Sequence, residues 1–425
     1  MRRTNKNPVR LFLALFILLV TGGFYNSVHA ADPQTFWKYQ CVDTMKDSRD
    51  NARNWANRAD LPQLVAGEIS TIKAMGANCV AIGTPYDDEF IPYLKVWVNQ
   101  AHGQGLRVWF RGNLSGWEGW FSYPILNNTD EHNLKIARFI NNNPGLFHDG
   151  DIFTPAPEPE QGKVIGDPRD SDAQKTEYLK FLVDSYNNCV LAFGLINIKV
   201  TCGYFSTNGD IAKNILTPEV VAQIGNVVVV DHYVASPETL VNDLVALHDK
   251  FNAKIMLGEF GAPIPDINGN MTESQQAEFI DGVLSGLVQH QDIIEGVNYW
   301  TLANSSTALL NNDSSPKKAV DVIKHYYIPA QVKGTVVTTT GEKISGAKVV
   351  SASGSGQTIT DQNGQYSLSL PAGKTELEID SQAYQLATAT VNLKSGQQVS
   401  QNVTLVPKGG WLGNTWQWIK NLFGF

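Results

Sequence analysis

Short apolar runs alternate with amphipathic stretches from about residue 36 to residue 328 of this 425-residue chain. Each apolar run ends in polar or aromatic residues, which is typical of a buried parallel strand that emerges from a sheet. The predicted strands are Tyr39–Asp43, Asn78–Gly83, Leu106–Arg111, Asp151–Pro155, Ile196–Cys202, Val227–Tyr233, Lys254–Glu259 and Gly296–Trp300.

Helical periodicity marks most of the segments between these strands. Ser236 before Pro237 is typical of a helix N-cap followed by proline at the first helical position. Thr272 and Gln275 match a capping box. The stretch 208–224 is the weakest helix, because Pro218 interrupts it. The other predicted helices are Leu61–Met75, Phe90–His102, Asp130–Asn142, Ser171–Val190, Pro237–Phe251 and Thr272–Gln289.

This alternation predicts an α/β fold, a (β/α)8 TIM barrel that occupies residues 31–328. A doubly wound open sheet is the alternative. Such a sheet more often carries a Gly-rich phosphate loop after its first strand, and the sequence has none there. The pattern therefore favours the barrel.

The composition changes near residue 329, where tryptophan disappears and Thr, Val, Ser and Gly dominate as far as residue 407. Short alternating segments separated by turns predict a small β-sandwich for residues 329–407. Within it, Asp361–Gly364 predicts a hairpin turn with glycine at the position that needs a positive φ.

Three motifs of this sandwich are KGTVV (333–337), GAKVV (346–350) and TDQNGQYS (360–367). Their order resembles that of the carboxypeptidase regulatory-like domain, a transthyretin-like sandwich. The resemblance implies a spacer, adhesion or carbohydrate-associated module, and it does not imply peptidase activity.

The first 30 residues are typical of a secretory signal peptide. Basic residues precede the apolar run Leu11–Val20, which is too short to span a bilayer, and Val28–Ala30 resembles a cleavage site. We therefore expect a secreted, extracellular protein; an uncleaved N-terminal anchor is the alternative. The tail, residues 408–425, either packs on a domain or contacts a membrane or envelope surface through its aromatic residues. These are Trp411, Trp416, Trp418, Phe423 and Phe425.

The net charge of −8 argues against nucleic acid as the partner, because phosphate binding needs a basic face. The four cysteines match no zinc pattern, and we expect neither a metal nor an organic cofactor. Cys41, Cys79 and Cys202 lie in apolar runs and are expected to be small core residues. Export also permits a Cys189–Cys202 disulfide.

Two carboxylates follow predicted strands in a way that suits catalysis. Glu259 ends the apolar strand in MLGEFGAP, and Glu158 follows an earlier strand in FTPAPEPEQG. The carboxyl ends of barrel strands meet at one face, so both side chains point to one cleft. Two such carboxylates are the minimum equipment for cleaving a glycosidic bond. Glu160 is the alternative partner of Glu259.

Other residues at strand ends are candidates for binding a sugar, whose C–H face packs on aromatic rings while its hydroxyls need polar partners. For Trp117, packing beneath its own loop is an equal alternative, and a structural hydrogen bond is the stronger expectation for His232. The candidate substrate-binding residues are Arg111, Asn113, Trp117, Glu160, Tyr204, His232, Tyr233 and Trp300.

Residues 36–327 resemble a clan A glycoside hydrolase. The resemblance implies that Glu259 in LGEFG is the nucleophile and that Glu158 in PEPE is the acid/base. It implies a retaining mechanism on a β-linked oligo- or polysaccharide, with Tyr233 beside the nucleophile and Trp300 under the cleaved sugar. One departure is Pro157, which stands where the clan has Asn. A non-catalytic carbohydrate-binding or envelope protein on the same barrel is therefore the alternative function.

Overall fold

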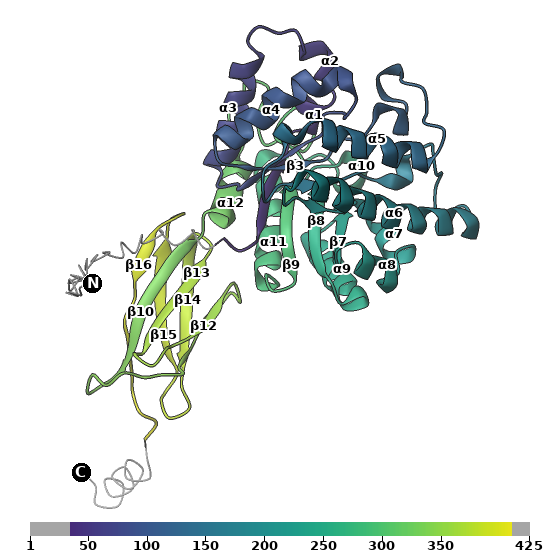
Figure 1. Ribbon diagram of the computed structural model, residues 1–425. Coiled ribbons are helices and arrows are strands. Elements are labelled where there is room, and N and C mark those ends of the chain that lie inside the picture. The colour runs from purple at the N-terminus through teal and green to yellow at the C-terminus, as the bar shows by residue number, and fades with distance from the viewer. Residues whose placement is uncertain (1–34, 410–425) are drawn as a thin grey trace, which may run out of the picture. The chain divides into compact units, whose positions relative to one another are not determined.

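The computed structural model describes residues 35–409, so the expected signal peptide and most of the aromatic tail lie outside the described residues. The first part of the described chain is a curled parallel sheet with helices around it (Figure 1). Neighbouring strands pair in the order β5-β4-β3-β2-β1-β9-β8-β7-β6. The strands are β1 Tyr39–Asp43, β2 Cys79–Ile82, β3 Arg107–Phe110, β4 Ile152–Phe153, β5 Thr201–Cys202, β6 Thr207–Asn208, β7 Val227–Asp231, β8 Lys254–Phe260 and β9 Ile294–Tyr299.

The sheet has nine strand segments but eight barrel positions, because the fifth position is divided. Strand β5 pairs with β4, while β6, a few residues later, pairs with β7. The intervening turn needs Gly203, whose φ is +81° and where a Cβ would lie 2.4 Å from the Tyr186 ring. The barrel therefore closes through the covalent chain at 203–206, and the predicted (β/α)8 architecture is confirmed.

Helices follow most strands, largely as the periodicity predicted. Ser236 caps α9 and Thr272 caps α11 with both capping-box bonds present, as expected. Thr217 and Pro218 start a separate short helix, so the break at Pro218 is also confirmed. The helices are α1 Met45–Ser48, α2 Ala52–Trp55, α3 Leu61–Ala74, α4 Ile91–Gly103, α5 Thr129–Asn142, α6 Asp172–Ile196, α7 Gly209–Asn214, α8 Pro218–Gln223, α9 Pro237–Phe251, α10 Pro265–Asn268, α11 Glu273–Gln289 and α12 Lys318–Tyr327.

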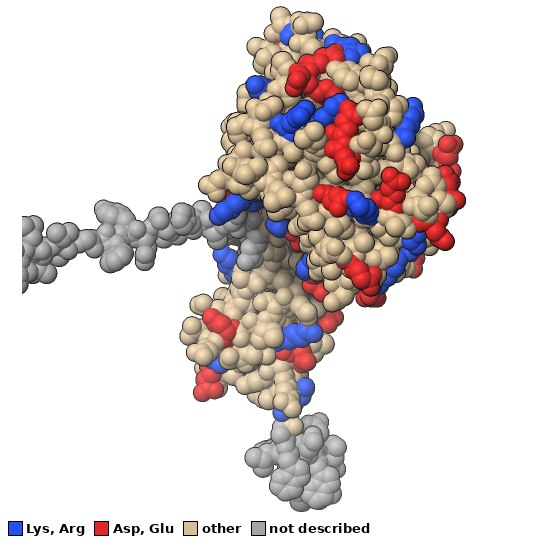
Figure 2. Space-filling view, turned by 45° about the vertical axis from the view of Figure 1, so that its right-hand side comes forward, with Lys and Arg blue, Asp and Glu red and all other residues tan. Residues whose placement is uncertain are grey.

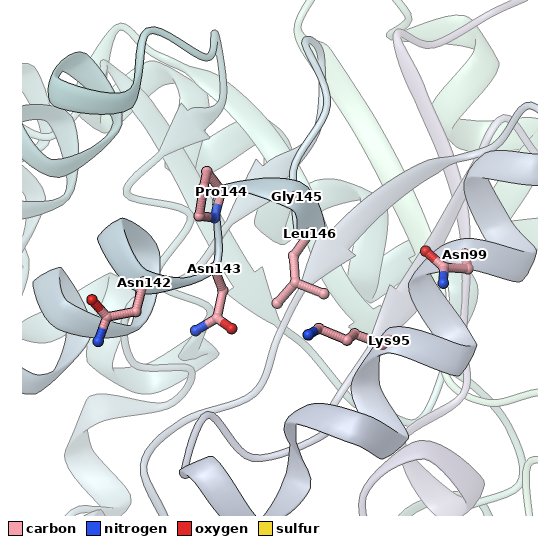
Figure 3. A pocket seen from close by; sticks show the side chains of 7 residues that line it. All are labelled: Lys95, Asn99, Asn142, Asn143, Pro144, Gly145 and Leu146. Carbon is pink, nitrogen blue, oxygen red and sulfur yellow. The ribbon is translucent and has the colours of Figure 1, made fainter.

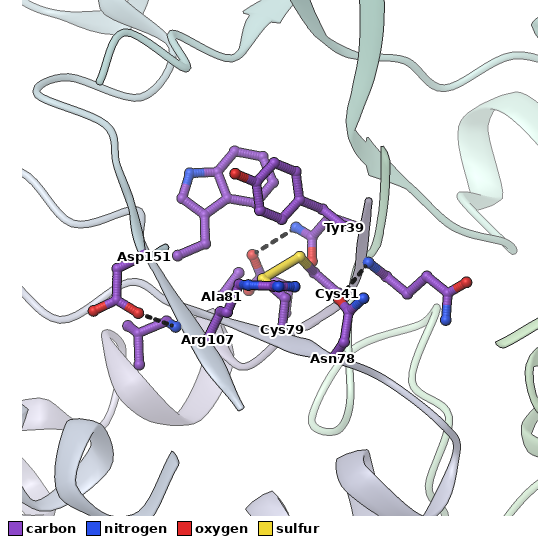
Figure 4. The surroundings of a disulfide bond; sticks show 12 residues. Tyr39, Cys41, Asn78, Cys79, Ala81, Arg107 and Asp151 are labelled. Atoms are coloured by element: carbon purple, nitrogen blue, oxygen red, sulfur yellow. Dashed lines mark hydrogen bonds between the residues drawn. A yellow bond between two sulfur atoms is a disulfide. The ribbon is translucent and has the colours of Figure 1, made fainter. Parts of the chain in front are cut away.

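The barrel interior contains a disulfide that the sequence did not predict. Cys41 and Cys79 are paired residues on β1 and β2 and are bridged, with Tyr39 and Ala81 beside them (Figure 4). The expectation that Cys41 and Cys79 are unpaired core residues is therefore wrong, because strand register brings them together across 38 residues of sequence. Cys189 and Cys202 are buried and free, so the alternative bridge is not formed.

The second part of the described chain is a two-sheet sandwich with its own apolar core. One sheet contains β13, β10, β16 and β17, and the other has the order β12-β11-β14-β15. The strands are β10 Ala330–Thr338, β11 Lys348–Ser351, β12 Gln357–Ile359, β13 Gln365–Leu370, β14 Gly373–Asp380, β15 Ala387–Leu393, β16 Gln398–Ser400 and β17 Val403–Leu405.

The turn Asp361–Gly364 forms as expected, with Gly364 at φ +69° and its N–H donating to the Asp361 carbonyl. The strands on either side of it do not form a hairpin, however. Strand β12 pairs with β11, whereas β13 pairs with β10 in the other sheet. The predicted hairpin is therefore wrong, because the turn carries the chain from one sheet of the sandwich to the other.

Acidic and basic side chains are interspersed over the face shown in Figure 2, without a large patch of one sign. Among the described helices, none combines the length and the hydropathy needed to cross a bilayer.

Candidate active site

Arg111 organises the carboxyl end of the barrel. It follows β3, is 1% exposed, and donates from Nη1 to Asp43 Oδ2 and to Glu259 Oε1, both at 2.9 Å. Its Nη2 donates to Ser206 Oγ at 2.8 Å and to Asp231 Oδ2 at 3.0 Å. One guanidinium thus ties together residues from four separate parts of the barrel, and its planar fork fixes their relative positions.

The three carboxylates around Arg111 carry more negative charge than one cation balances. Burial raises the pKa of Asp43, and burial together with the Glu259 charge raises the pKa of Asp231 well above its ordinary value. Asp231 is 3% exposed, and its Oδ1 has no hydrogen-bond partner among the described residues. The charged form of Asp231 is therefore costly, because one of its buried oxygens has no donor and Arg111 is shared among three acidic residues.

Glu259 lies within β8 and receives donors on both oxygens. The Tyr233 hydroxyl donates to Glu259 Oε2 at 2.8 Å, opposite the Arg111 bond to Oε1. Burial and the Glu259 charge raise the pKa of Tyr233 well above 10, so the phenol stays protonated and remains a donor. Trp300 stands edge-on to the Tyr233 ring, with ring centres 6.3 Å apart. The predicted strand-end residues Arg111, Tyr233 and Trp300 are thus brought to Glu259.

Glu158 lies in a strained part of the loop after β4. Its backbone is left-handed, with φ 43° and ψ 60°, and it precedes Pro159. A side chain at Cβ and a following proline both make this left-handed backbone conformation unfavourable, at a cost of about 1–3 kcal/mol. The Glu158 N–H donates to the Ser206 carbonyl at 2.7 Å, and Ser206 Oγ accepts from Arg111. Glu158 is therefore held to the same network that holds Glu259.

The electrostatic surroundings of Glu158 differ from those of an ordinary surface carboxylate. Burial and the negative charge of Glu259 raise the pKa of Glu158 to about 8. Glu160 and Glu118 act in the same direction, and Arg111 opposes them. A carboxyl group in this state is protonated at neutral pH, whereas the carboxylate that it faces has an arginine partner.

Glu160 is fixed by structural contacts. It is 6% exposed, and it accepts hydrogen bonds from the Tyr178 hydroxyl at 3.1 Å and from the Asn208 backbone N–H at 2.7 Å. Both oxygens are thus engaged with α6 and β6. This placement does not match the expected contact between Glu160 and a substrate.

Asn113 and Trp117 are both buried beneath the loop that follows β3. Asn113 Oδ1 accepts from the His132 ring at 2.8 Å, and Trp117 stacks on Phe181 with ring centres 4.9 Å apart. Neither side chain is exposed. Of the two expectations for Trp117, the structure agrees with packing under its loop, and the expected substrate contact of Asn113 is not matched.

Tyr204 and His232 form their hydrogen bonds with residues other than Glu158 and Glu259. The Tyr204 ring fills the barrel interior, and its hydroxyl donates at 3.4 Å to Glu295, the second residue of β9 and so near the opposite end of the barrel. His232 pairs through Nε2 with Asp243 on α9 at 2.7 Å. The expected substrate contacts of both residues are therefore not matched. For His232 the structural hydrogen bond is the one observed.

The candidate site residues drawn from the sequence did not include three members of this network. Asp43 and Asp231 end β1 and β7, and their position after apolar strands was the available signal. Ser206 lies in the irregular link between β5 and β6, where no periodic pattern marks it. All three contact Arg111 directly, so the arginine is the centre of the network rather than an accessory to Glu259.

Two further features bear on the site. Within residues 35–409, no group of three or more His, Cys, Asp or Glu side chains is arranged to hold a metal ion. A cavity of about 330 Å³ lies between α4 and the segment that leads into β4. Its lining includes Lys95, Asn99 and Asn143 (Figure 3). Because the chain enters β4 there, this cavity is at the end of the barrel opposite Glu158 and Glu259.

Comparison with known proteins agrees with both halves of the architecture. The family model of the carboxypeptidase regulatory-like domain matches residues 331–406, so the sandwich is a domain of that family and the resemblance seen in the sequence is confirmed. No curated protein sequence shows significant similarity to this chain.

Solved structures share the barrel. A GH5_18 protein from Streptomyces cattleya, crystallised with GlcNAc, is 15% identical with a TM-score of 0.52, over 72% of this chain and 85% of that one. A GH5_18 protein from Bifidobacterium longum subsp. infantis is 14% identical with a TM-score of 0.51, over 73% of this chain and 87% of that one. A family 5 xyloglucanase from Paenibacillus pabuli is 13% identical with a TM-score of 0.51, over 69% of this chain and 99% of that one. The first part of the chain therefore has the same barrel fold as these three structures.

Proposed function

We propose that the protein is a retaining glycoside hydrolase that cleaves a β-linked glycan. The observation that carries this proposal is the contrast between two carboxyl groups in one network. Glu259 is held by Arg111 and Tyr233, while burial and neighbouring acids raise the pKa of Glu158 to about 8. One ionised carboxylate and one protonated carboxyl are the equipment of this reaction.

In the first step, Glu259 attacks the anomeric carbon, and the bond from that carbon to the leaving oxygen breaks. Glu158 gives its proton to the leaving oxygen, and a glycosyl ester forms on Glu259. The Tyr233 hydroxyl and Arg111 position the attacking carboxylate through the bonds described above. In the second step Glu158, now ionised, takes a proton from water. The water oxygen bonds to the anomeric carbon, and the ester to Glu259 breaks.

We infer that Glu158 rather than Glu160 is the acid/base. Both oxygens of Glu160 already accept hydrogen bonds. Within the described part of the chain, the Glu158 carboxyl forms no side-chain hydrogen bond and is affected by charge and burial alone. Its strained backbone supports the same choice, since such strain is common at functional sites.

The test measures product release from a panel of β-glucans, mannans, xylans, galactans and chitin-type glycans. Wild type is compared with Glu259→Gln, Glu158→Gln and, as a matched control, Glu160→Gln. We expect turnover to fall at least about a thousandfold for Glu259→Gln, because the nucleophile is lost. Glu158→Gln should lose kcat/KM on glycans but keep most of its kcat/KM on glycosides with an acidic phenol as leaving group, because ester formation then needs no proton donor. Its kcat on these glycosides should fall, because the second step has lost its base.

The outcomes separate the alternatives. Retained turnover in Glu158→Gln with loss in Glu160→Gln would move the acid/base role to Glu160. Glycan binding without turnover in wild type would favour the non-catalytic carbohydrate-binding function, for which Pro157 in place of the clan's Asn is the sequence argument. We also propose that the chain is exported, with residues 1–30 removed and the tail in contact with an envelope surface. Fractionation of the expressed full chain tests both points.

A further inference from the structure

A ring of side chain contacts leads from Glu259 around one side of the site to Glu158. From Glu259 it passes through Tyr233 to Trp300, and the Lys46 ammonium lies 5.6 Å from the centre of the Trp300 ring. Lys46 forms an ion pair with Asp50 at 3.0 Å. These residues place α1 and the segment after it beside the cleaving position.

From Asp50 the contacts continue towards Glu158. Asp50 accepts from Arg49 at 2.8 Å, and the Arg49 guanidinium lies 4.7 Å from the centre of the Trp120 ring. The Trp120 side chain interacts with the Glu118 carboxylate. The negative charge of Glu118 in turn contributes to the raised pKa of Glu158. The loop after β3, residues 115–122, also packs on the segment that follows Glu158, because a Cβ at Gly162 would lie 2.2 Å from Trp117 Nε1.

Backbone geometry holds this loop in place. The Lys163 N–H donates to the Trp117 carbonyl at 3.1 Å, which ties the loop to the segment that follows Glu158. Gly119, Phe121 and Ser122 all have positive φ values, of 86°, 52° and 62°. The two non-glycine residues are strained, and strain of this kind persists where the surrounding structure fixes the backbone.

The loop divides its aromatic residues between packing and exposure. Trp117 is fully buried, and Phe121 packs on Phe90 with ring centres 4.7 Å apart. Trp120 and Glu118 remain partly exposed. Next to each other, an aromatic ring can pack on the C–H face of a sugar and a carboxylate can accept hydrogen bonds from the hydroxyls of the same sugar.

We propose that Trp120 and Glu118 form the subsite for the leaving-group sugar, so that the substrate is a saccharide with a sugar unit on the reducing side of the cleaved bond. This proposal rests on the proposed function, because Glu158 defines which side of the bond departs. The acid/base protonates the leaving oxygen, and the group that carries this oxygen lies towards the loop that bears Trp120.

The experiment compares two substrates with the same sugar at the cleaved position: an oligosaccharide and a glycosyl fluoride, whose leaving group is too small to reach Trp120. For Trp120→Leu we expect the ratio of kcat/KM on the oligosaccharide to that on the fluoride to fall about tenfold, the size expected for a lost aromatic stacking contact. Glu118→Ala should lower the same ratio. Phe121→Leu, in the same loop but packed on Phe90, should leave the ratio as in wild type.

An unchanged ratio in Trp120→Leu and Glu118→Ala would overturn the subsite, as would an equal loss on both substrates. Should Trp120→Leu fail to fold, Trp120→Phe keeps a ring, and the subsite predicts a ratio between those of Trp120→Leu and wild type; a wild-type ratio would again overturn it. If wild type hydrolyses neither substrate, the proposed function itself fails, and that result differs from every outcome that concerns the subsite.

Discussion

Glu158 combines a left-handed backbone with a carboxyl group that is costly to ionise. Its φ of 43° precedes a proline, and burial beside Glu259 raises its pKa to about 8. Neither feature stabilises the folded chain. Both features place a proton donor close to the proposed nucleophile. Their cost in folding free energy is offset by stabilising contacts elsewhere in the fold.

This pKa makes stability depend on pH with a definite sign. In the unfolded chain Glu158 loses its proton near its ordinary value of 4.5, while in the folded chain it keeps the proton up to about 8. Folded protein thus binds more protons between these values, and its free energy of unfolding falls as the pH rises through them. We predict that Glu158→Gln has a higher Tm than wild type at pH 8 and an equal Tm at pH 4, measured by differential scanning fluorimetry.

Glu68 on α3 provides a matched control. Burial raises its pKa to about 8, and its Oε2 has no partner among the described residues. By the same sign, Glu68→Gln should raise the Tm at pH 8 and not at pH 4. Hydrolysis should be unaffected, because Glu68 contacts none of the proposed catalytic groups. A lower Tm for both variants at pH 8 would show that the two carboxyls stabilise the fold.

Hydrolysis should follow the protonation of Glu158. We predict that kcat/KM on glycans falls as the pH rises through about 8, because the general acid is then ionised. Substrates with an acidic phenol leaving group should show a weaker fall. The measurement is a pH profile of both substrate types. The same alkaline fall for both would assign it to a group other than the acid.

The ends of the predicted strands identified some residues of the site but not the others. Glu259, Tyr233 and Trp300 each follow or end a strand whose apolar run is clear in the sequence. Tyr204 does not point where its position after a strand predicts, because the direction of its side chain depends on how the chain turns after β5, and a shift of one residue reverses it. Ser206 gave no signal at all, since its role is to join two loops in space.

At the scale of elements, Gly258 in β8 lets two supporting side chains approach Arg111. A Cβ there would lie 2.4 Å from Asp231 Oδ1 and 3.1 Å from Ser206 Cβ. Both of these residues accept from Arg111. We predict that Gly258→Ala displaces the network and lowers kcat at least about tenfold, because sub-ångström shifts in positioning are costly in catalysis.

The control for Gly258 is Gly67 on α3, where no atom lies within 4 Å of an added Cβ. Gly67→Ala should leave kcat unchanged and stabilise the helix by up to about 1 kcal/mol. The measurements are steady-state kinetics and thermal unfolding of both variants. Wild-type kcat in Gly258→Ala would mean that the backbone yields and that the glycine is not needed for the network.

The sequence predicted the type of element correctly where apolar positions recur regularly. The prediction failed where apolar residues are exposed instead of buried. The apolar run Ile196–Cys202 predicts a strand, yet α6 continues to Ile196 and β5 begins at Thr201. Leu191 and Leu195 on α6 are 69% and 78% exposed, so their apolar character misled the pattern. Helix α12 was missed because it lies next to the change of composition near residue 329.

At the scale of the whole molecule, the barrel and the sandwich have separate apolar cores. The large cluster ends at Tyr327, and the sandwich cluster begins at Ala330. We predict that a chain ended after residue 328 folds and hydrolyses soluble substrates as the full chain does, measured by circular dichroism and kinetics. Aggregation of the shortened chain would show that the carboxypeptidase regulatory-like domain contributes to the stability of the barrel.

The divided fifth position of the barrel has a consequence for stereochemistry. Strands β5 and β6 are the two ends of the sheet, and the chain between them is a tether across a seam. Glu158 follows β4 on one side of the seam, and Glu259 lies on β8 on the other. The tether takes part in spacing the two carboxyls, because its Ser206 carbonyl accepts from the Glu158 N–H and its Ser206 hydroxyl accepts from the Arg111 that holds Glu259. The retaining mechanism proposed above needs about 5–5.5 Å between the two carboxyls. We predict that a residue inserted within 203–206 widens their separation towards the range that admits a water molecule, at which a glycosidase inverts.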